Sequence, residues 1–185
     1  MRRAQRRRVV RGTMAGIAGG LAASWVMNIF MEKLGGKITE SLMSDEDRVE
    51  QHLKQQRERE SGNQEPEEDA TMKAAEDVVH TVSRGQHLSH EERKTAGPVV
   101  HYAFGALVGG LYGALAECTD WTSVGFGTVF GTLVYIGADL IAVPAFGWGP
   151  SPTEQPVKAQ ATPLAAHLVY GATTDLLRRA IRAAA

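Results

Sequence analysis

Charged side chains are almost absent from four long stretches of the chain, although they are frequent elsewhere. The stretches are residues 12–31, 97–116, 122–146 and 162–177. A helix needs about 20 mostly apolar residues, at ~1.5 Å of rise each, to cross a lipid bilayer. The first three stretches reach this length and the fourth is shorter. The pattern therefore predicts three spanning helices and a fourth candidate.

Two other interpretations of the apolar stretches agree less well with the pattern. Buried helices of a soluble protein are one, but an amphipathic helix of such a protein has a polar face, and these stretches show none. A cleaved signal peptide is another interpretation of residues 12–31. The apolar run of residues 12–31 is longer than that of a typical signal peptide, and no small-residue cleavage site follows it. We therefore interpret this stretch as an uncleaved membrane anchor.

Arginines near both ends of the chain predict its orientation. Six of the first eleven residues are arginine, and Arg178, Arg179 and Arg182 follow the fourth stretch. Lysine and arginine beside spanning helices favour the cytoplasmic side. An even number of crossings puts both clusters on that side, so we expect four spans with both termini in the cytoplasm. The basic N-terminus is expected to lie against anionic lipid.

Residues 35–96 are polar and would then lie outside the cytoplasm. They hold 15 acidic residues against nine basic ones. Residues 44–47 have the pattern of a capping box ahead of a helix over 48–60, and residues 61–66 indicate a break. An amphipathic helix is predicted over 70–84, and its apolar face should pack on the protein or on lipid. That face consists of Met72, Ala75, Val79 and Val82.

A capping box and two prolines predict where the second and third helices begin and end. Ser89 and Glu92 have the spacing of a capping box, so the second helix should begin outside the membrane and pass Pro98 with a kink. Pro144 is predicted to kink or end the third helix.

The remaining composition excludes several classes of protein. The formal net charge is −1, which gives no basic field for nucleic acid. The lone Cys118 excludes an intramolecular disulfide and a cysteine-based zinc site. No nucleophile elbow, phosphate-binding loop or paired-cysteine motif is present. We therefore expect no enzyme activity and no nucleic-acid partner.

Small residues recur every four positions in three of the apolar stretches. They are Gly12, Gly16 and Gly20, then Gly105, Gly109 and Gly113, and finally Gly127 and Gly131. Helices in lipid associate through close backbone packing, because their apolar side chains gain little by leaving the bilayer. We therefore expect a tight helical bundle. The same glycine-rich faces also suit a homo-oligomer.

Three ionisable residues occupy similar depths in the predicted bundle. His101 and His167 lie four and five residues inside their stretches, and Asp139 lies five residues before Pro144. The predicted topology places all three in the outer leaflet. Ionisable groups within a membrane are costly and usually functional.

Four chemical roles remain open for His101, Asp139 and His167. The first is a hydrogen-bonded clamp between helices, and the second is a proton relay or pH sensor. The third is a metal site of two imidazoles and a carboxylate, and the fourth is a haem held by the two histidines. We expect no cofactor, with a metal ion or haem as the alternatives.

Further charged residues lie at the predicted inner edge of the membrane. Glu117 and Asp120 flank the turn between the second and third helices, and Asp175 is one turn from Arg178 and Arg179. Asp175 should pair with these arginines. We interpret all three acids as interfacial anchors.

Several short motifs in the second half of the chain occur together in one family. They are His101-Tyr102-Ala103-Phe104-Gly105 with Gly109, Tyr112 and Glu117, then Trp121 before a glycine-rich helix, Pro144-x-x-Gly147, and His167-Leu168-Val169-Tyr170-Gly171 ahead of Arg178-Arg179. With these motifs, residues 89–182 resemble the YagU-like family of bacterial inner-membrane proteins of unknown function. The resemblance implies a small multi-spanning protein of the bacterial cytoplasmic membrane, associated with acid tolerance. Asp139 stands where the family pattern has a histidine, which excludes a three-histidine site.

The sequence thus predicts an all-α integral membrane bundle of four transmembrane helices with an extracytoplasmic, partly helical insertion. Its parts are a basic cytoplasmic N-terminus (1–11), the first helix (12–34), the acidic segment (35–96), a YagU-like three-helix region (97–182) and a tail (183–185). The predicted function is proton- or ion-linked transport or acid-stress tolerance through His101, Asp139 and His167. The alternative is a non-catalytic structural or assembly protein whose histidines only clamp helices, with the lipid bilayer as partner in either case.

Overall fold

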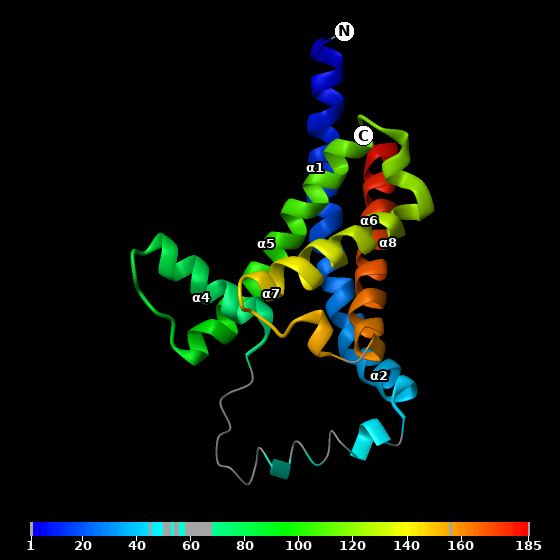
Figure 1. The fold of residues 1–185 in the computed structure, drawn as a ribbon. Coiled ribbons are helices and arrows are strands. Elements are labelled where there is room, and N and C mark those ends of the chain that lie inside the picture. Colours follow the sequence, from blue (N-terminus) through cyan, green and yellow to red (C-terminus); the bar gives the residue numbers. More distant parts are fainter. Residues whose placement is uncertain are drawn as a thin grey trace.

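The computed structural model describes residues 2–44, 46–49, 53, 56–57, 68–155 and 157–184. Within these ranges the chain is helical and contains no β-strand, which confirms the all-α prediction (Figure 1). Three helical segments of the described chain are long and apolar enough to cross a membrane: Arg3–Leu42, His90–Ala116 and Val124–Ala145. They cover the first three predicted spans. The fourth candidate forms a helix, α8 (Ala161–Ala184), that is not among these three.

The first membrane helix is longer than the apolar stretch that predicts it. α1 (Arg2–Phe30) continues through a π-helical segment, Met31–Gly35, into α2 (Gly36–Leu42). The arginines before Gly12 are helical because arginine is a good helix former and no proline or glycine interrupts them. The basic segment is therefore a direct extension of the spanning helix.

The second membrane helix, α5 (His90–Ala116), has the predicted N-terminal cap. The Ser89 hydroxyl accepts a hydrogen bond from the Glu92 backbone N–H, and the Glu92 carboxylate accepts one from the Ser89 N–H. Two of the free backbone donors at the helix start are satisfied in this way. The helix runs through Pro98 as a single element.

α4 (Ala70–Val82) is the predicted amphipathic helix, and it packs on the first half of α5. Met72 and Ala75 are buried, and Met72 lies against Gly97 of α5. Val82, placed on the same face by the pattern, is 79% exposed. The prediction is wrong for this residue because α5 covers only the N-terminal part of α4.

The third apolar stretch is not one regular helix. It starts with a 3-10 segment, Asp120–Gly127, in which Gly125, Phe126 and Gly127 have positive φ. α6 (Thr128–Tyr135) follows, then a π-helical segment, Ile136–Ala142, and α7 (Val143–Ala145). The prediction of helix from residue 122 is wrong, because the left-handed turn delays the α-helix to Thr128. The helix ends one residue after Pro144, as predicted.

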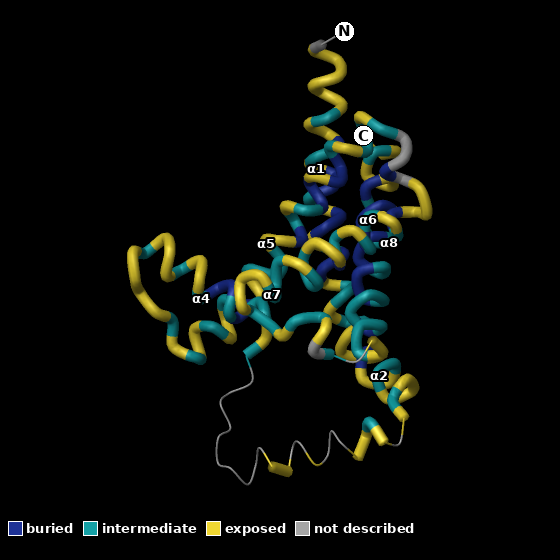
Figure 2. Tube along the Cα trace, viewed as in Figure 1, coloured by how far each residue is buried: buried dark blue, intermediate teal, exposed yellow. Residues whose placement is uncertain are grey.

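Neighbouring helices of the bundle run in opposite directions. α1 is antiparallel to α5 and to α8, and α6 is antiparallel to α8, so both ends of the chain lie at one end of the bundle (Figure 1). Buried residues line the facing sides of α1, α5 and α8, and exposed residues cover the outside (Figure 2). The largest fully buried side chains are Tyr112, Thr174, Asp175 and Ser24. Large apolar side chains such as Leu107, 74% exposed, point outward, as expected of helices that face lipid.

The acidic segment is described only in part. Ser44 and Asp47 make the hydrogen bonds of the predicted capping box, and residues 46–49 are helical. Most of the predicted helix over 48–60, and the break at 61–66, lie outside the described residues.

Candidate functional site

The glycines of α1 and α5 face each other along one antiparallel contact. A Cβ atom on Gly16 or Gly20 would collide with the backbone oxygen of Gly109 or Gly105, respectively. Gly12 and Gly113 meet in the same way one turn further along. Two backbones approach this closely only where neither carries a side chain.

A second contact of this kind joins α6 to α8. A Cβ on Gly131 would collide with the backbone oxygen of His167, and one on Gly127 would collide with that of Gly171. Because Gly131 lies two turns before Asp139, this contact also sets the height of Asp139 relative to His167.

His167 and Asp139 form the most direct pair among the predicted cluster residues. The Asp139 Oδ2 atom is 3.6 Å from His167 Nδ1. The same Nδ1 is 3.0 Å from the carbonyl oxygen of Pro163, which can only accept a hydrogen bond. The hydrogen therefore lies on Nδ1 of the neutral ring, which leaves Nε2 as the basic nitrogen. The Tyr135 ring packs beside the imidazole, with 5.6 Å between ring centroids.

His101 lies on α5 at the level of this pair but in contact with α1. It sits beside the Ser24 backbone and within electrostatic range of His167 and Asp139. Its Nε2 atom is buried, and so is the Ser24 hydroxyl oxygen. Neither atom has a hydrogen-bond partner in the described part of the chain. Buried polar atoms rarely lack a hydrogen-bond partner, and such exceptions often mark functional positions.

A cavity of about 220 Å³ lies beside Asp139. Its polar lining is Asp139, Gln155 and Gln160, and Pro163 also contributes to its wall. Gln160 accepts a 2.6 Å hydrogen bond from the Tyr135 hydroxyl. The residues that hold His167 Nδ1 therefore also border the cavity.

The arrangement of the described residues can be compared with the metal and haem hypotheses. Among the described residues, no three His, Cys, Asp or Glu side chains are grouped so as to hold a metal ion. The metal interpretation requires such a group and stays a prediction. The haem interpretation stays a prediction, which an absorbance spectrum of the purified protein would test.

The sequence predicts the charged cluster at the other end of the bundle only as a set of interfacial anchors. Asp175 is fully buried, and it accepts hydrogen bonds from Arg178 at 3.1 Å and Arg179 at 2.7 Å. The predicted pairing is therefore present, but inside the bundle rather than at its surface. The spacing of Asp175 from Arg178 and Arg179, three and four residues along one helix, is enough to predict the ion pairs. The burial of Asp175 is not predicted by this spacing, because it depends on the close approach of Gly127.

Glu117 links three helices within this cluster. It accepts hydrogen bonds from Arg182 Nε at 2.8 Å and Arg182 Nη2 at 3.2 Å, and Arg8 and Arg178 each lie 3.7 Å away. The hydrogen bonds from Arg182, with the positive charges around them, hold the pKa of Glu117 below its ordinary value of 4.5. The ends of α1, α5 and α8 are thereby joined. The side chain of Asp120 lies outside the described part of the structure.

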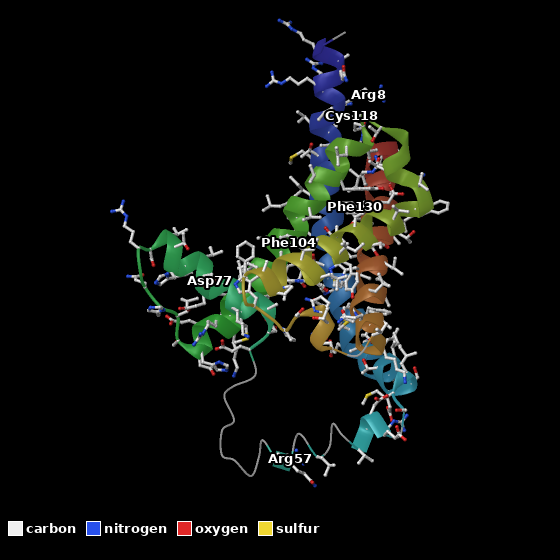
Figure 3. All side chains as sticks on the ribbon, viewed as in Figure 1. Arg8, Arg57, Asp77, Phe104, Cys118 and Phe130 are labelled. Atoms are coloured by element: carbon white, nitrogen blue, oxygen red, sulfur yellow. The ribbon has the colours of Figure 1, made fainter. Side chains whose placement is uncertain are left out.

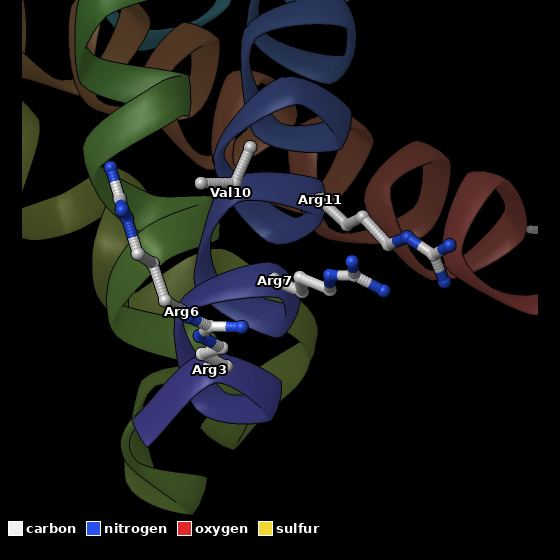
Figure 4. Close-up of a pocket in the computed structure, with 5 residues that line it drawn as sticks. All are labelled: Arg3, Arg6, Arg7, Val10 and Arg11. Carbon is white, nitrogen blue, oxygen red and sulfur yellow. The ribbon is translucent and has the colours of Figure 1, made fainter. Parts of the chain in front are cut away.

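The N-terminal arginines extend beyond this cluster on α1. Arg6 leaves the helix on one side and Arg7 and Arg11 on the other (Figure 4). Arg8 and Cys118 both lie at this end of the bundle, whereas Asp77 of α4 lies toward the other end (Figure 3). The bundle therefore has an arginine-rich end and an α4 end.

Comparison with known proteins identifies the family. A sequence model of a family described as "Protein of unknown function (DUF1440)" matches residues 61–176, more than half of the chain. No curated protein and no solved structure matches the chain. The match begins within the acidic segment and includes α4, α5, α6 and most of α8, and with them His101, Asp139 and His167. The chain belongs to this DUF1440 family of uncharacterised proteins.

Proposed function

We propose that the chain is a multi-pass, YagU-like protein of the bacterial cytoplasmic membrane that binds protons at His101, Asp139 and His167. In this proposal α8 is a fourth span, both termini are cytoplasmic, and the α4 end faces outward. The protein would serve proton-linked transport or tolerance of acid stress. We expect no catalytic activity, and the lipid bilayer is the partner.

The observation that carries this proposal is the 3.6 Å approach of Asp139 Oδ2 to His167 Nδ1. With its Nδ1 hydrogen directed to Pro163, the imidazole can take a further proton only at Nε2. The resulting imidazolium is stabilised by the adjacent carboxylate. A neutral imidazole beside a carboxylate, within a helix bundle, is suited to reversible proton binding.

A second candidate function is a structural or assembly role in which the histidines only hold helices together. The glycine contacts and the Glu117–Arg182 pair favour it, because they join the long helices without any chemistry. A homo-oligomer through the glycine-rich faces stays a prediction. In one copy of the chain these faces pack α1 on α5 and α6 on α8.

Nuclear magnetic resonance of ¹⁵N-labelled histidines in lipid nanodiscs tests proton binding. We expect the His167 resonances to show that its ring binds a proton at Nε2 when the sample is acidified, and Asp139→Asn to alter this response. His167→Gln assigns the signals, and His80→Gln is the control because His80 is exposed on α4. A His167 signal that does not change between acidic and alkaline pH would refute the proposal.

A cellular experiment separates the two candidate functions. In cells that depend on this protein during acid stress, His101→Gln combined with His167→Gln should abolish the pH-dependent phenotype while membrane levels stay normal. His80→Gln should leave the phenotype intact. Unchanged behaviour of the double variant would favour the structural role.

A further inference from the structure

The cavity beside Asp139 lies at the α4 end of the bundle. Ala70, the first residue of α4, and Gln155 of the segment before α8 form part of its wall. At about 220 Å³ the cavity has room for several water molecules, each of which occupies about 30 Å³ in the liquid. Two glutamines and a carboxylate supply the polar partners that such water needs.

Asp139 and His167 are arranged in series behind this cavity. The Asp139 side chain is 34% exposed, whereas that of His167 is only 9% exposed. The carboxylate therefore meets the cavity first, and the imidazole lies behind it. A proton that arrives in the cavity reaches Asp139 before His167.

His101 and Ser24 lie on the α1–α5 side of this pair. The space next to Gly105, one turn along from His101, is filled by the Ser24 hydroxyl. His101 Nε2 and Ser24 Oγ are buried polar atoms whose hydrogen-bonding capacity is unused among the described residues. They form a second buried polar site, on the α1–α5 side of the Asp139–His167 pair.

The glycine contacts lie between this second polar site and the arginine-rich end. Along α1 and α5, the positions next to Gly105, Gly109 and Gly113 are filled by backbone or side-chain atoms of the facing helix. Gly127 and Gly131 are in equally close contact with α8. Backbone in direct contact leaves no room for water between α1 and α5, or between α6 and α8, along these turns.

We propose that protons reach His167 and His101 only from the α4 end, through the cavity beside Asp139, and that their path stops at Ser24. The site then senses or stores protons from one side and does not conduct them to the arginine-rich end. This inference rests on the proposed function and decides between its two forms, in favour of sensing over transport.

The charges around the site are few. His101 is faced by His167 from α8, by Asp139 from the π-helical segment and by Asp69 from the start of α4. His167 is faced by Asp139 and by the Tyr135 ring. The Asp69 carboxylate caps α4 by accepting a hydrogen bond from the Met72 N–H. Asp139 and Asp69, both at the α4 end, are thus the acidic groups near the two histidines.

Blocking the cavity tests whether His167 is reached through it. In a Cys118→Ser background, Gln155→Cys places a thiol in the cavity wall, and a bulky charged thiol reagent then fills the cavity. Modification of single histidines by diethyl pyrocarbonate is measured by peptide mass spectrometry, with exposed His87 as the internal control. We expect the label to abolish modification of His167 and to leave that of His87 unchanged. Equal modification of His167 with and without the label, or none in either case, would overturn the route.

Reconstituted vesicles test from which side of the bilayer protons reach the site and whether they cross it. In a Gln155→Cys variant that keeps the native Cys118, a membrane-impermeant thiol reagent should reach the introduced thiol and Cys118 from opposite sides of the bilayer. Vesicles with a trapped pH-sensitive dye should show no more proton flux than empty vesicles. Labelling of both thiols from one side, or a flux that His101→Gln abolishes, would overturn the inference. Proton binding by His167 in the resonance titration would still stand after such a result, so the two failures are distinguishable.

Discussion

The residues that fix this bundle at the atomic scale are mostly small or charged. Glycines let α1 approach α5, and α6 approach α8, until their backbones touch. Asp175 and Arg178 are almost completely buried and form a hydrogen-bonded ion pair. At this scale, close backbone contact and buried ion pairs replace the large apolar core of a soluble protein.

Replacing Gly109 should therefore be far more damaging than replacing a glycine that faces open space. In Gly109→Ala the new methyl group collides with the backbone oxygen of Gly16, so we expect a loss of about 1–3 kcal/mol in stability. Gly137→Ala is the matched control, because a Cβ there meets no atom within 4 Å. Alanine should leave that site unchanged or stabilise it by up to ~1 kcal/mol. Thermal unfolding in detergent, monitored by circular dichroism, measures the stability of both variants. Equal effects of Gly109→Ala and Gly137→Ala would contradict the close contact between Gly109 and Gly16.

Asp175→Asn should destabilise the protein strongly, because it removes the charged acceptor of two arginines at a fully buried position. Breaking a buried ion pair on one side costs about 3–5 kcal/mol. Asp77→Asn is the control, since Asp77 is exposed and an asparagine oxygen can still accept the hydrogen bond from Trp148. A chemical denaturation series on the three proteins checks this, and similar midpoints for Asp175→Asn and the parent chain would refute it.

At the scale of elements, two antiparallel helix contacts are held by different means at their two ends. The α1–α5 contact ends at Glu117, which binds Arg182 of α8 and lies near Arg8 of α1. The α6–α8 contact ends at the His167–Asp139 pair and the cavity beside it. The α1–α5 contact is thus closed by ion pairs at its end, and the α6–α8 contact ends at the Asp139–His167 pair with the cavity beside it.

The Glu117–Arg182 link should make stability depend on pH in a defined direction. Because folding lowers the pKa of Glu117, its contribution is complete above the ordinary value of 4.5 and is lost as the pH falls through the lowered value. We expect Glu117→Gln to lower the unfolding temperature at neutral pH and to match the parent chain in strong acid. Glu91→Gln, at an exposed pair with Lys94, should have little effect at any pH. A difference between Glu117→Gln and the parent chain that grows as the pH falls would contradict this.

At the scale of the whole molecule, the long helices bring both termini to the arginine-rich end (Figure 1). Three of the described helical segments qualify as spans by length and composition, and α8 carries Asp175 and three arginines in its second half. The α8 charges pair with one another and with Glu117 inside the bundle. Paired charges lower the cost of placing α8 in the membrane.

Reporter fusions test whether α8 crosses the membrane. A reporter that is active only in the cytoplasm should be active when fused after residue 185 and inactive when fused after residue 155. A reporter that is active only outside the cytoplasm should give the reverse pattern. Activity of the same reporter at both positions would show that α8 does not cross.

The local pattern predicts much of the element content. Uncharged runs locate α1, α5 and the α6–α7 region, and the Ser89–Glu92 spacing locates the start of α5, because these signals depend only on nearby residues. The left-handed turn at Gly125–Gly127 is not predicted, since an apolar run looks the same whether its first turn is helical or not. The prediction for Val82 is wrong because periodicity describes one helix and not the length of its neighbour.

The candidate site, like the fold, is predicted only in part by the sequence. The sequence by itself determined that His101, Asp139 and His167 lie in apolar segments, because charge depletion and residue spacing are local properties of the chain. Only the tertiary structure decided that Asp139 meets His167 at 3.6 Å while His101 turns toward Ser24, and that a cavity opens beside Asp139. It also decided that Asp175 is fully buried inside the bundle. The physical reason is that rotation and height of one helix relative to another are set by glycine contacts between residues far apart in the chain, and no local pattern contains them.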